Sequence, residues 1–134
     1  MNFLADNEKY VSLVSYRASG TGVPTAVWFA KFGDAANTYC VITEANAGKV
    51  KRIRKNPNIE VQACDIKGNV TVSATTYSGF ARLVTGTEAL AVRKAIAKRY
   101  GITYKLFSVY NSIGSLLKRR YALPETNIIF TLND

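Results

Sequence analysis

Short runs of β-branched and aromatic residues, separated by turns that contain glycine, most constrain how this chain folds. The first three runs and the two turns between them occupy, in order, residues 10–17, 18–22, 24–32, 33–37 and 38–43. Such runs are typical of β-strands, and turns this short join neighbouring strands antiparallel. The first third of the chain is therefore predicted to be a three-stranded antiparallel meander.

Further strands and a short helix are predicted beyond this meander. Apolar and β-branched residues predict strands at 59–65, 70–73, 77–84 and 127–132. A short helix is predicted over 46–55, with Asn46 as its N-cap. The helix is expected to end before Asn56, because a residue that precedes proline is pushed out of the helical region.

A longer helical segment lies near residues 86–118. Thr85 and Glu88 have the spacing of a capping box, which opens a helix, and Gly101 is expected to end that helix. A second amphipathic helix is predicted over 103–118. About six or seven hairpin-joined strands, the short helix and this helical pair predict one domain over residues 1–134. Its expected class is mainly β (α+β), built on a small antiparallel barrel.

The composition excludes several kinds of chemistry. The chain contains no histidine, so it lacks the base of Ser-His-Asp and Cys-His catalysis and the commonest metal ligand. Cys40 and Cys64 do not form a CxxC pair and are expected to be buried, reduced thiols. No apolar run is long enough to span a bilayer, and no signal peptide is visible, so the cytoplasm is the expected location. We therefore expect no metal site, and we expect any demanding chemistry to belong to an organic cofactor.

The net charge of +9 indicates an anionic partner. The basic residues of segment 48–55 are Lys49, Lys51, Arg52, Arg54 and Lys55. Lys49 falls in the first turn of the predicted helix, where free N–H groups and the helix dipole suit a phosphate. A solvated basic helix face is the alternative, and charge alone does not decide between the two.

Four short patterns, in this order and spacing, resemble the pyridoxamine-5′-phosphate-oxidase-like split β-barrel family. They are Gly22-Val-Pro-Thr-Ala-Val-Trp-Phe29, Tyr39-Cys-Val-Ile-Thr43, Gly48-Lys-x-x-x-Ile-Arg-Lys-Asn-Pro57 and Ala63-Cys-Asp-x-x-Gly68. Within this family the chain is most similar to small oxidoreductases that use a flavin or the deazaflavin coenzyme F-420. The resemblance covers residues 11–100. It implies an antiparallel split β-barrel and a homodimer with cofactor sites between its subunits.

The resemblance also implies which residues bind the cofactor. In chain order they are Val27, Trp28, Phe29, Ile42, Thr43, Gly48, Lys49 and Lys51. The first three would lie along the flavin-type ring, the next two would contact the cofactor from the end of the third strand, and Lys49 would bind its phosphate. No catalytic side chain is assigned.

The chain departs from the oxidase pattern at three positions. Val27 replaces an arginine, and Ala47 and Gly48 replace a serine and an arginine before the lysine. These replacements argue against vitamin B6 oxidation and tight FMN binding. The positive charge at Lys51, Arg54 and Lys55 suits instead a longer anionic tail, such as the oligoglutamate of coenzyme F-420.

The expected activity is that of an oxidoreductase. It would transfer hydride between FMN or coenzyme F-420 (8-hydroxy-5-deazaflavin) and a small conjugated acceptor. A flavin- or tetrapyrrole-binding protein without turnover is one alternative. A nucleic-acid binder is another, although the sequence shows no zinc finger, helix-turn-helix or aromatic RNA-binding motif.

Overall fold

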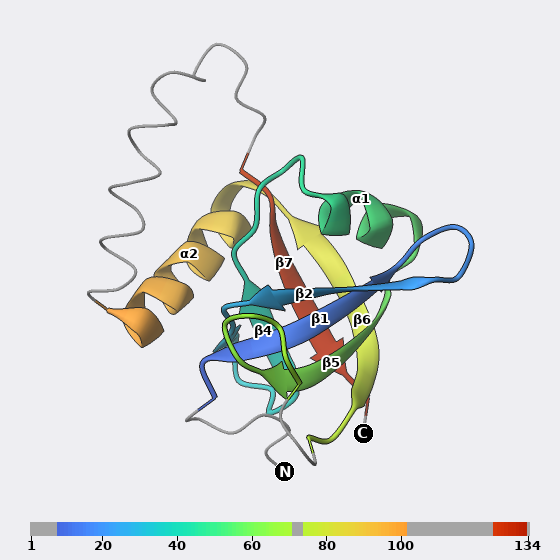
Figure 1. Ribbon diagram of the computed structural model, residues 1–134. Coiled ribbons are helices and arrows are strands. Elements are labelled where there is room, and N and C mark those ends of the chain that lie inside the picture. The colour runs from blue at the N-terminus through green and yellow to red at the C-terminus, as the bar shows by residue number, and fades with distance from the viewer. Residues whose placement is uncertain (1–7, 71–73, 102–124, 134) are drawn as a thin grey trace.

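The computed structural model describes residues 8–70, 74–101 and 125–133 of the chain (Figure 1). They form one seven-stranded antiparallel sheet and two helices. The strands are β1 (Tyr10–Tyr16), β2 (Gly22–Val27), β3 (Ala30–Lys31), β4 (Thr38–Val41), β5 (Asn58–Cys64), β6 (Tyr77–Val84) and β7 (Asn127–Leu132). The helices are α1 (Gly48–Lys55) and α2 (Gly86–Tyr100). The order of strands across the sheet is β2-β1-β5-β6-β7-β4-β3.

The sheet curls because its two edge strands are consecutive in the chain. β2 ends at Val27 and β3 begins at Ala30, although the two strands lie at opposite edges. The backbone between these residues spans at most about 11 Å, whereas the edges of a flat sheet of this size would lie about 29 Å apart. The edges must therefore approach each other, and the sheet forms a curled half-barrel (Figure 1). The predicted mainly β barrel is confirmed.

The meander predicted for residues 10–43 is wrong in its middle strand, although antiparallel pairing occurs on both sides of it. The predicted strand 24–32 is divided at Trp28 and Phe29 into β2, which pairs with β1, and β3, which pairs with β4. The alternation of side chains continues through the division. Val27 and Phe29 both belong to the interior cluster, whereas Trp28 packs against a different cluster. The side-chain pattern alone therefore does not reveal that the backbone changes its hydrogen-bonding partner from β1 to β4.

Two apolar clusters hold the fold together. The interior cluster is built from β1, β2, β4, β5, β6 and β7, and Ile53 of α1 packs into it. The second cluster lies between α2 and the sheet, where Val92 and Ile96 pack with Cys40 and Ile129. Cys40 and Cys64 are both free and buried, as predicted.

The helix starts differ from the predicted ones. α1 begins at Gly48, and its N-cap is Ala47 rather than Asn46, with no side-chain capping bond. The predicted capping box of α2 is not formed, because Thr85 makes no side-chain bond to the helix. Glu88 is instead paired with Arg82, at 2.9 Å.

Other predicted elements agree with the structure or lie outside the described residues. β5, β6 and β7 match their predicted bounds to within one residue, and Gly101, with φ of 59°, ends α2 as expected. The predicted helix over 103–118 and most of the predicted strand over 70–73 fall outside the described ranges. Neither described helix is long and apolar enough to cross a membrane.

Candidate functional site

The start of α1 is electropositive. The backbone N–H groups of Val50 and Lys51 donate to the carbonyl of Ala47, whereas those of Gly48 and Lys49 have no hydrogen-bond partner in the described part of the chain. The first turn of the helix contains no acidic residue. Free donors and the positive end of the helix dipole therefore meet at one place, an arrangement that favours an anion.

Lys49 brings an ammonium group to this helix start. Burial of its side chain lowers its pKa, the carboxylate of Glu44 opposes that shift, and the guanidinium of Arg52 adds to it. No carboxylate of the described residues lies within ion-pair distance of Lys49. Lys49 is therefore a partly desolvated cation with no ion-pair partner among the described residues, an arrangement that a bound anion would stabilise.

Arg52 places a second cation beside Lys49. Its Nε donates a 2.7 Å hydrogen bond to Oγ of Ser15, which is fully buried on β1. Its Nη1 approaches the helix start so closely that a Cβ added at Gly48 would lie only 2.9 Å away. Gly48 therefore leaves the space in which the guanidinium lies against the first turn.

The loop between β4 and α1 contributes a buried polar atom. Oγ1 of Thr43 is buried and has no hydrogen-bond partner among the described residues. The backbone N–H of Thr43 donates to Oδ1 of Asn127 at 3.1 Å, and Nδ2 of Asn127 donates to the carbonyl of Ala89 in α2 at 2.9 Å. Ile42, the residue before Thr43, packs against the apolar cluster between α2 and the sheet. A buried hydroxyl without a partner is costly, and a bound ligand would remove that cost.

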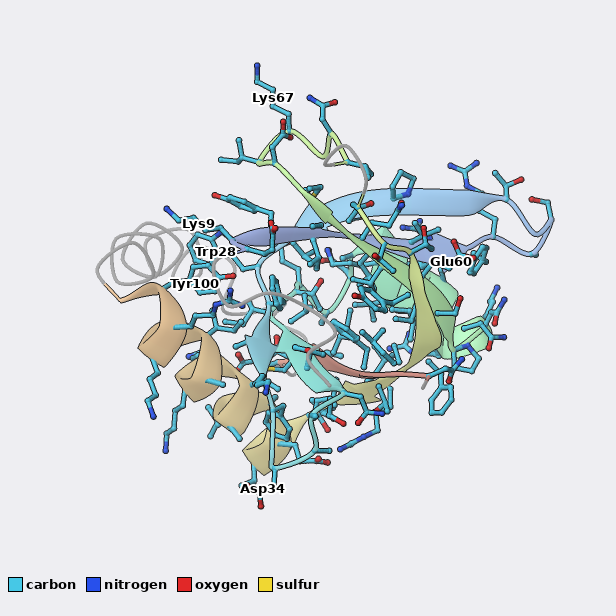
Figure 2. All side chains as sticks on the ribbon, turned by 90° about the horizontal axis from the view of Figure 1, so that it is seen from below. Lys9, Trp28, Asp34, Glu60, Lys67 and Tyr100 are labelled. Atoms are coloured by element: carbon cyan, nitrogen blue, oxygen red, sulfur yellow. The ribbon has the colours of Figure 1, made fainter. Side chains whose placement is uncertain are left out.

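The residues expected along the cofactor ring lie at the crossover between β2 and β3. The side chains of Val27 and Phe29 belong to the interior cluster and are buried there. Trp28 stacks on Tyr100 of α2, with ring centroids 4.5 Å apart and ring planes 9° apart, and Figure 2 shows the two rings together. A cofactor ring along this segment would therefore meet the backbone and Trp28 rather than the side chains of Val27 and Phe29.

The end of α2 fixes this crossover. The hydroxyl of Tyr100 accepts a 3.1 Å hydrogen bond from the N–H of Phe29 and donates a 2.7 Å bond to the carbonyl of Lys9. Arg99 donates to the carbonyl of Phe29 at 2.7 Å and to the carbonyl of Glu8. Its guanidinium also lies 4.1 Å from the centre of the Phe29 ring. Figure 2 shows Lys9, Trp28 and Tyr100 close together, at a distance from Glu60.

The structure regroups the basic residues of α1. Gly48 and Lys49 lie with Arg52, which the sequence did not single out as a ligand, whereas Lys51 is exposed to solvent, as are Arg54 and Lys55. The available signal for Arg52 was its spacing of three residues from Lys49, which places both on one flank of a helix. Lys51, which was predicted to bind the cofactor, is exposed and does not belong to the pair formed by Lys49 and Arg52.

A surface cavity of about 360 Å³ lies apart from the start of α1. Tyr16, Asn58 and Asn133 are among its lining residues, and none of the predicted cofactor-binding residues is. Glu60 is the only charged residue that lines it. An anion is therefore disfavoured in this cavity and favoured at the start of α1.

Known proteins resemble this chain in structure rather than in sequence. No protein-family profile and no curated sequence matches it. HutZ, the haem storage protein of Vibrio cholerae, superposes with a TM-score of 0.64 at 14% identity, over 96% of this chain and 84% of HutZ. An F-420 reductase superposes with a TM-score of 0.59 at 17% identity, over 96% of this chain and 90% of the reductase.

A third similar structure is the conserved hypothetical protein Rv2991 of Mycobacterium tuberculosis. Its TM-score is 0.59 at 17% identity, over 93% of this chain and 72% of Rv2991. At these identities the likeness establishes the fold and not the ligand. All three proteins have the pyridoxamine-5′-phosphate-oxidase-like split β-barrel, and this chain therefore has that fold, as its sequence resemblance predicted.

Proposed function

We propose that this chain binds a phosphate-bearing flavin-type cofactor, FMN or coenzyme F-420, and works as an oxidoreductase. The observation that carries the proposal is the pair of cations at the start of α1. Lys49 and Arg52 are close enough for the charge of one to lower the pKa of the other. Neither has a carboxylate within ion-pair distance among the described residues. A cofactor phosphate would supply the missing negative charge.

The residues at this helix start fit a phosphate. The N–H groups of Gly48 and Lys49, the Lys49 ammonium and the Arg52 guanidinium would hold its oxygens. The unpartnered hydroxyl of Thr43 would hydrogen-bond to the cofactor. A bound flavin or deazaflavin supplies hydride transfer. Trp28 and the backbone of the crossover would orient its ring for that transfer.

Haem is the second candidate, because one structural neighbour is a haem storage protein while another is an F-420 reductase. The two cations would suit haem propionates as well as phosphate. However, the chain has no histidine to ligate the iron. The Cys40 thiol is also a poor ligand, because burial raises its pKa to about 12. These facts argue against haem held by histidine or by the Cys40 thiolate, the two commonest protein ligands of haem iron.

The proposed substrate is a small conjugated acceptor that takes hydride from the reduced cofactor in the cytoplasm. We also propose a homodimer, as the sequence resemblance implies, and neither nucleic acid nor a membrane as partner. Sedimentation equilibrium tests the dimer. A single species with the 14.7 kDa mass of one chain would contradict it.

The proposed function is tested by titrating the purified protein with FMN, coenzyme F-420 and haem. Fluorescence reports the first two and absorbance the third. We expect micromolar or tighter binding of one flavin-type cofactor, weakened at least about tenfold by Lys49→Ala, since a charge-assisted bond to phosphate is lost. Lys94→Ala is the control, because Lys94 is an exposed cation on α2. Binding of haem alone, or of none of the three, would overturn the proposal.

The exposed cations of α1 allow a second comparison between the two cofactors. If Lys51 and Arg54 hold the oligoglutamate tail of coenzyme F-420, replacing both with alanine should weaken coenzyme F-420 binding more than FMN binding. Equal losses for both cofactors would contradict a role for these residues in tail recognition.

A further inference from the structure

One hydrogen bond orients Arg52, and the absence of a side chain at Gly48 leaves room for that orientation. Its Nε is bound to Oγ of Ser15, at 2.7 Å, and Ser15 is fully buried in β1. Its Nη1 lies against Gly48, where any side chain would collide with it. The Nη1 and Nη2 groups have no hydrogen-bond partner within the described ranges, so the outer edge of the guanidinium is left for a ligand. A guanidinium edge offers two parallel N–H bonds, which match two oxygens of one phosphate.

The charge balance at the start of α1 indicates how much negative charge the ligand carries. Lys49 and Arg52 supply two positive charges, and the helix start adds partial positive charge from its free N–H groups. The Glu44 carboxylate favours the charged form of Lys49, but it is exposed and outside ion-pair distance, so solvent and salt screen it and it does not occupy the ligand's place. A phosphodiester or a carboxylate, each with one negative charge, would leave one cation uncompensated. A phosphate monoester, with nearly two negative charges at neutral pH, would compensate both.

We propose that Arg52, oriented by Ser15 and by the absence of a side chain at Gly48, makes this site selective for a phosphate monoester over a phosphodiester. The inference rests on the proposed function and narrows it. FMN carries a terminal monoester, whereas the phosphate of coenzyme F-420 is a diester. Arg52 is a specificity-determining ligand, and Ser15 is a positioning residue.

The test uses two small probes that differ by one methyl group, methyl phosphate and dimethyl phosphate, at pH 8. Binding is followed by the NMR shifts of the Gly48 and Lys49 amides. We expect the parent protein to bind methyl phosphate at least about tenfold more tightly than dimethyl phosphate. Arg52→Ala should reduce this ratio to about twofold or less, mainly by weakening methyl phosphate. Arg17→Ala removes the same charge from an exposed position in the β1–β2 turn and should leave the ratio unchanged.

Three further variants separate orientation from charge. Arg52→Lys keeps the positive charge but removes the guanidinium, whose Nε bonds to Ser15. Ser15→Ala keeps the guanidinium but removes the hydroxyl that orients it. Both should lower the monoester-to-diester ratio, Arg52→Lys more strongly. Gly48→Ala should lower it as well while leaving the urea midpoint the same or higher, because alanine favours a helix over glycine.

The outcomes for the small probes and for the flavins are independent of each other. Equal binding of the two probes, or equal effects of Arg52→Ala and Arg17→Ala, would overturn the selectivity even if FMN binds. Selective binding of methyl phosphate, with no binding of either flavin-type cofactor, would leave the selectivity standing and overturn the proposed function. Tighter binding of coenzyme F-420 than of FMN would contradict the selectivity for a phosphate monoester but not the proposed function.

Discussion

Lys49 occupies a position where a cation is unfavourable for two reasons. It lies in the first turn of α1, at the positive end of the helix dipole, and its side chain is half-buried beside Arg52. An unfavourable charge that no described carboxylate pairs with directly is expected where a ligand supplies the partner. Lys49 is therefore expected to reduce stability in the free protein and to contribute affinity in the complex.

Replacing Lys49 with methionine tests this cost. The folded-state pKa of Lys49 lies below its ordinary value of 10.5, so the unfolded chain binds more protons between the two values. Stability of the parent should therefore rise with pH across that interval. We expect Lys49→Met to have the higher urea midpoint at pH 7, and the advantage to shrink as pH approaches 10.5. Lys94→Met makes the same change at an exposed position of α2 and is the control, which should not gain this stability at pH 7.

Individual residues of the candidate site were predictable from sequence to different degrees. Gly48 and Lys49 were predicted because a known pattern and a helix start coincide there. Arg52 was not chosen, because a basic helix has cations on every side and the sequence does not show which side meets the sheet. Ser15 had a weaker signal still: it follows Val11 and Leu13 at inward-facing positions, where a hydroxyl needs a partner, but nothing in the sequence names that partner.

At the scale of elements, α2 holds the crossover between the two edge strands. Tyr100 and Arg99 make hydrogen bonds to the backbone of Phe29 and stacking or cation–π contacts to Trp28 and Phe29. The sequence predicted α2 from the spacing of Thr85 and Glu88 and from Gly101. It did not predict the break between β2 and β3, because hydrogen bonds across the sheet, rather than side-chain alternation, end those strands.

Tyr100→Phe removes the hydroxyl and keeps the ring that stacks on Trp28. The part-buried N–H of Phe29 then loses its acceptor, so we expect a loss of about 1–3 kcal/mol in the free energy of unfolding. Trp28 is the only tryptophan, so its fluorescence reports directly whether the crossover loosens. Tyr10→Phe is the control, since the Tyr10 hydroxyl makes no hydrogen bond to the described residues. Equal losses in both variants would contradict a specific role for the Tyr100 hydroxyl.

At the scale of the whole molecule, β6 and β7 approach each other closely at Gly79. A Cβ added at Gly79 would lie 2.1 Å from the carbonyl oxygen of Thr131 and 2.9 Å from Cα of Leu132. Both are backbone atoms of a strand in the middle of the sheet, so they cannot move without moving the strand. The same substitution at Gly48 meets only side-chain atoms, those of the Arg52 guanidinium, which can move without moving a strand.

Gly79→Ala is therefore expected to cost more than about 3 kcal/mol of unfolding free energy, or to prevent folding. Urea denaturation of both glycine variants, followed by Trp28 fluorescence, measures the difference. A Gly79→Ala protein as stable as Gly48→Ala would show that the sheet tolerates a wider separation of β6 and β7.

The barrel as a whole was predictable because turn positions and strand lengths are local properties of the sequence. The order of the strands was not. β7, from the end of the chain, lies between β6 and β4, and its pairs Phe80–Thr131 and Tyr39–Phe130 join residues far apart in sequence. Only the packing of the interior cluster decides such partners, and no short pattern encodes it.

The two edges of the sheet also bear on how the protein behaves when it is concentrated. An unpaired edge strand is a template on which another chain can add by backbone hydrogen bonds, and this is a route to aggregates and fibrils. Here β2 carries Pro24, which has no N–H to donate, and β3 is only two residues long. The closure that brings these edges together through Trp28 and Phe29 therefore also leaves little edge on which another chain could add.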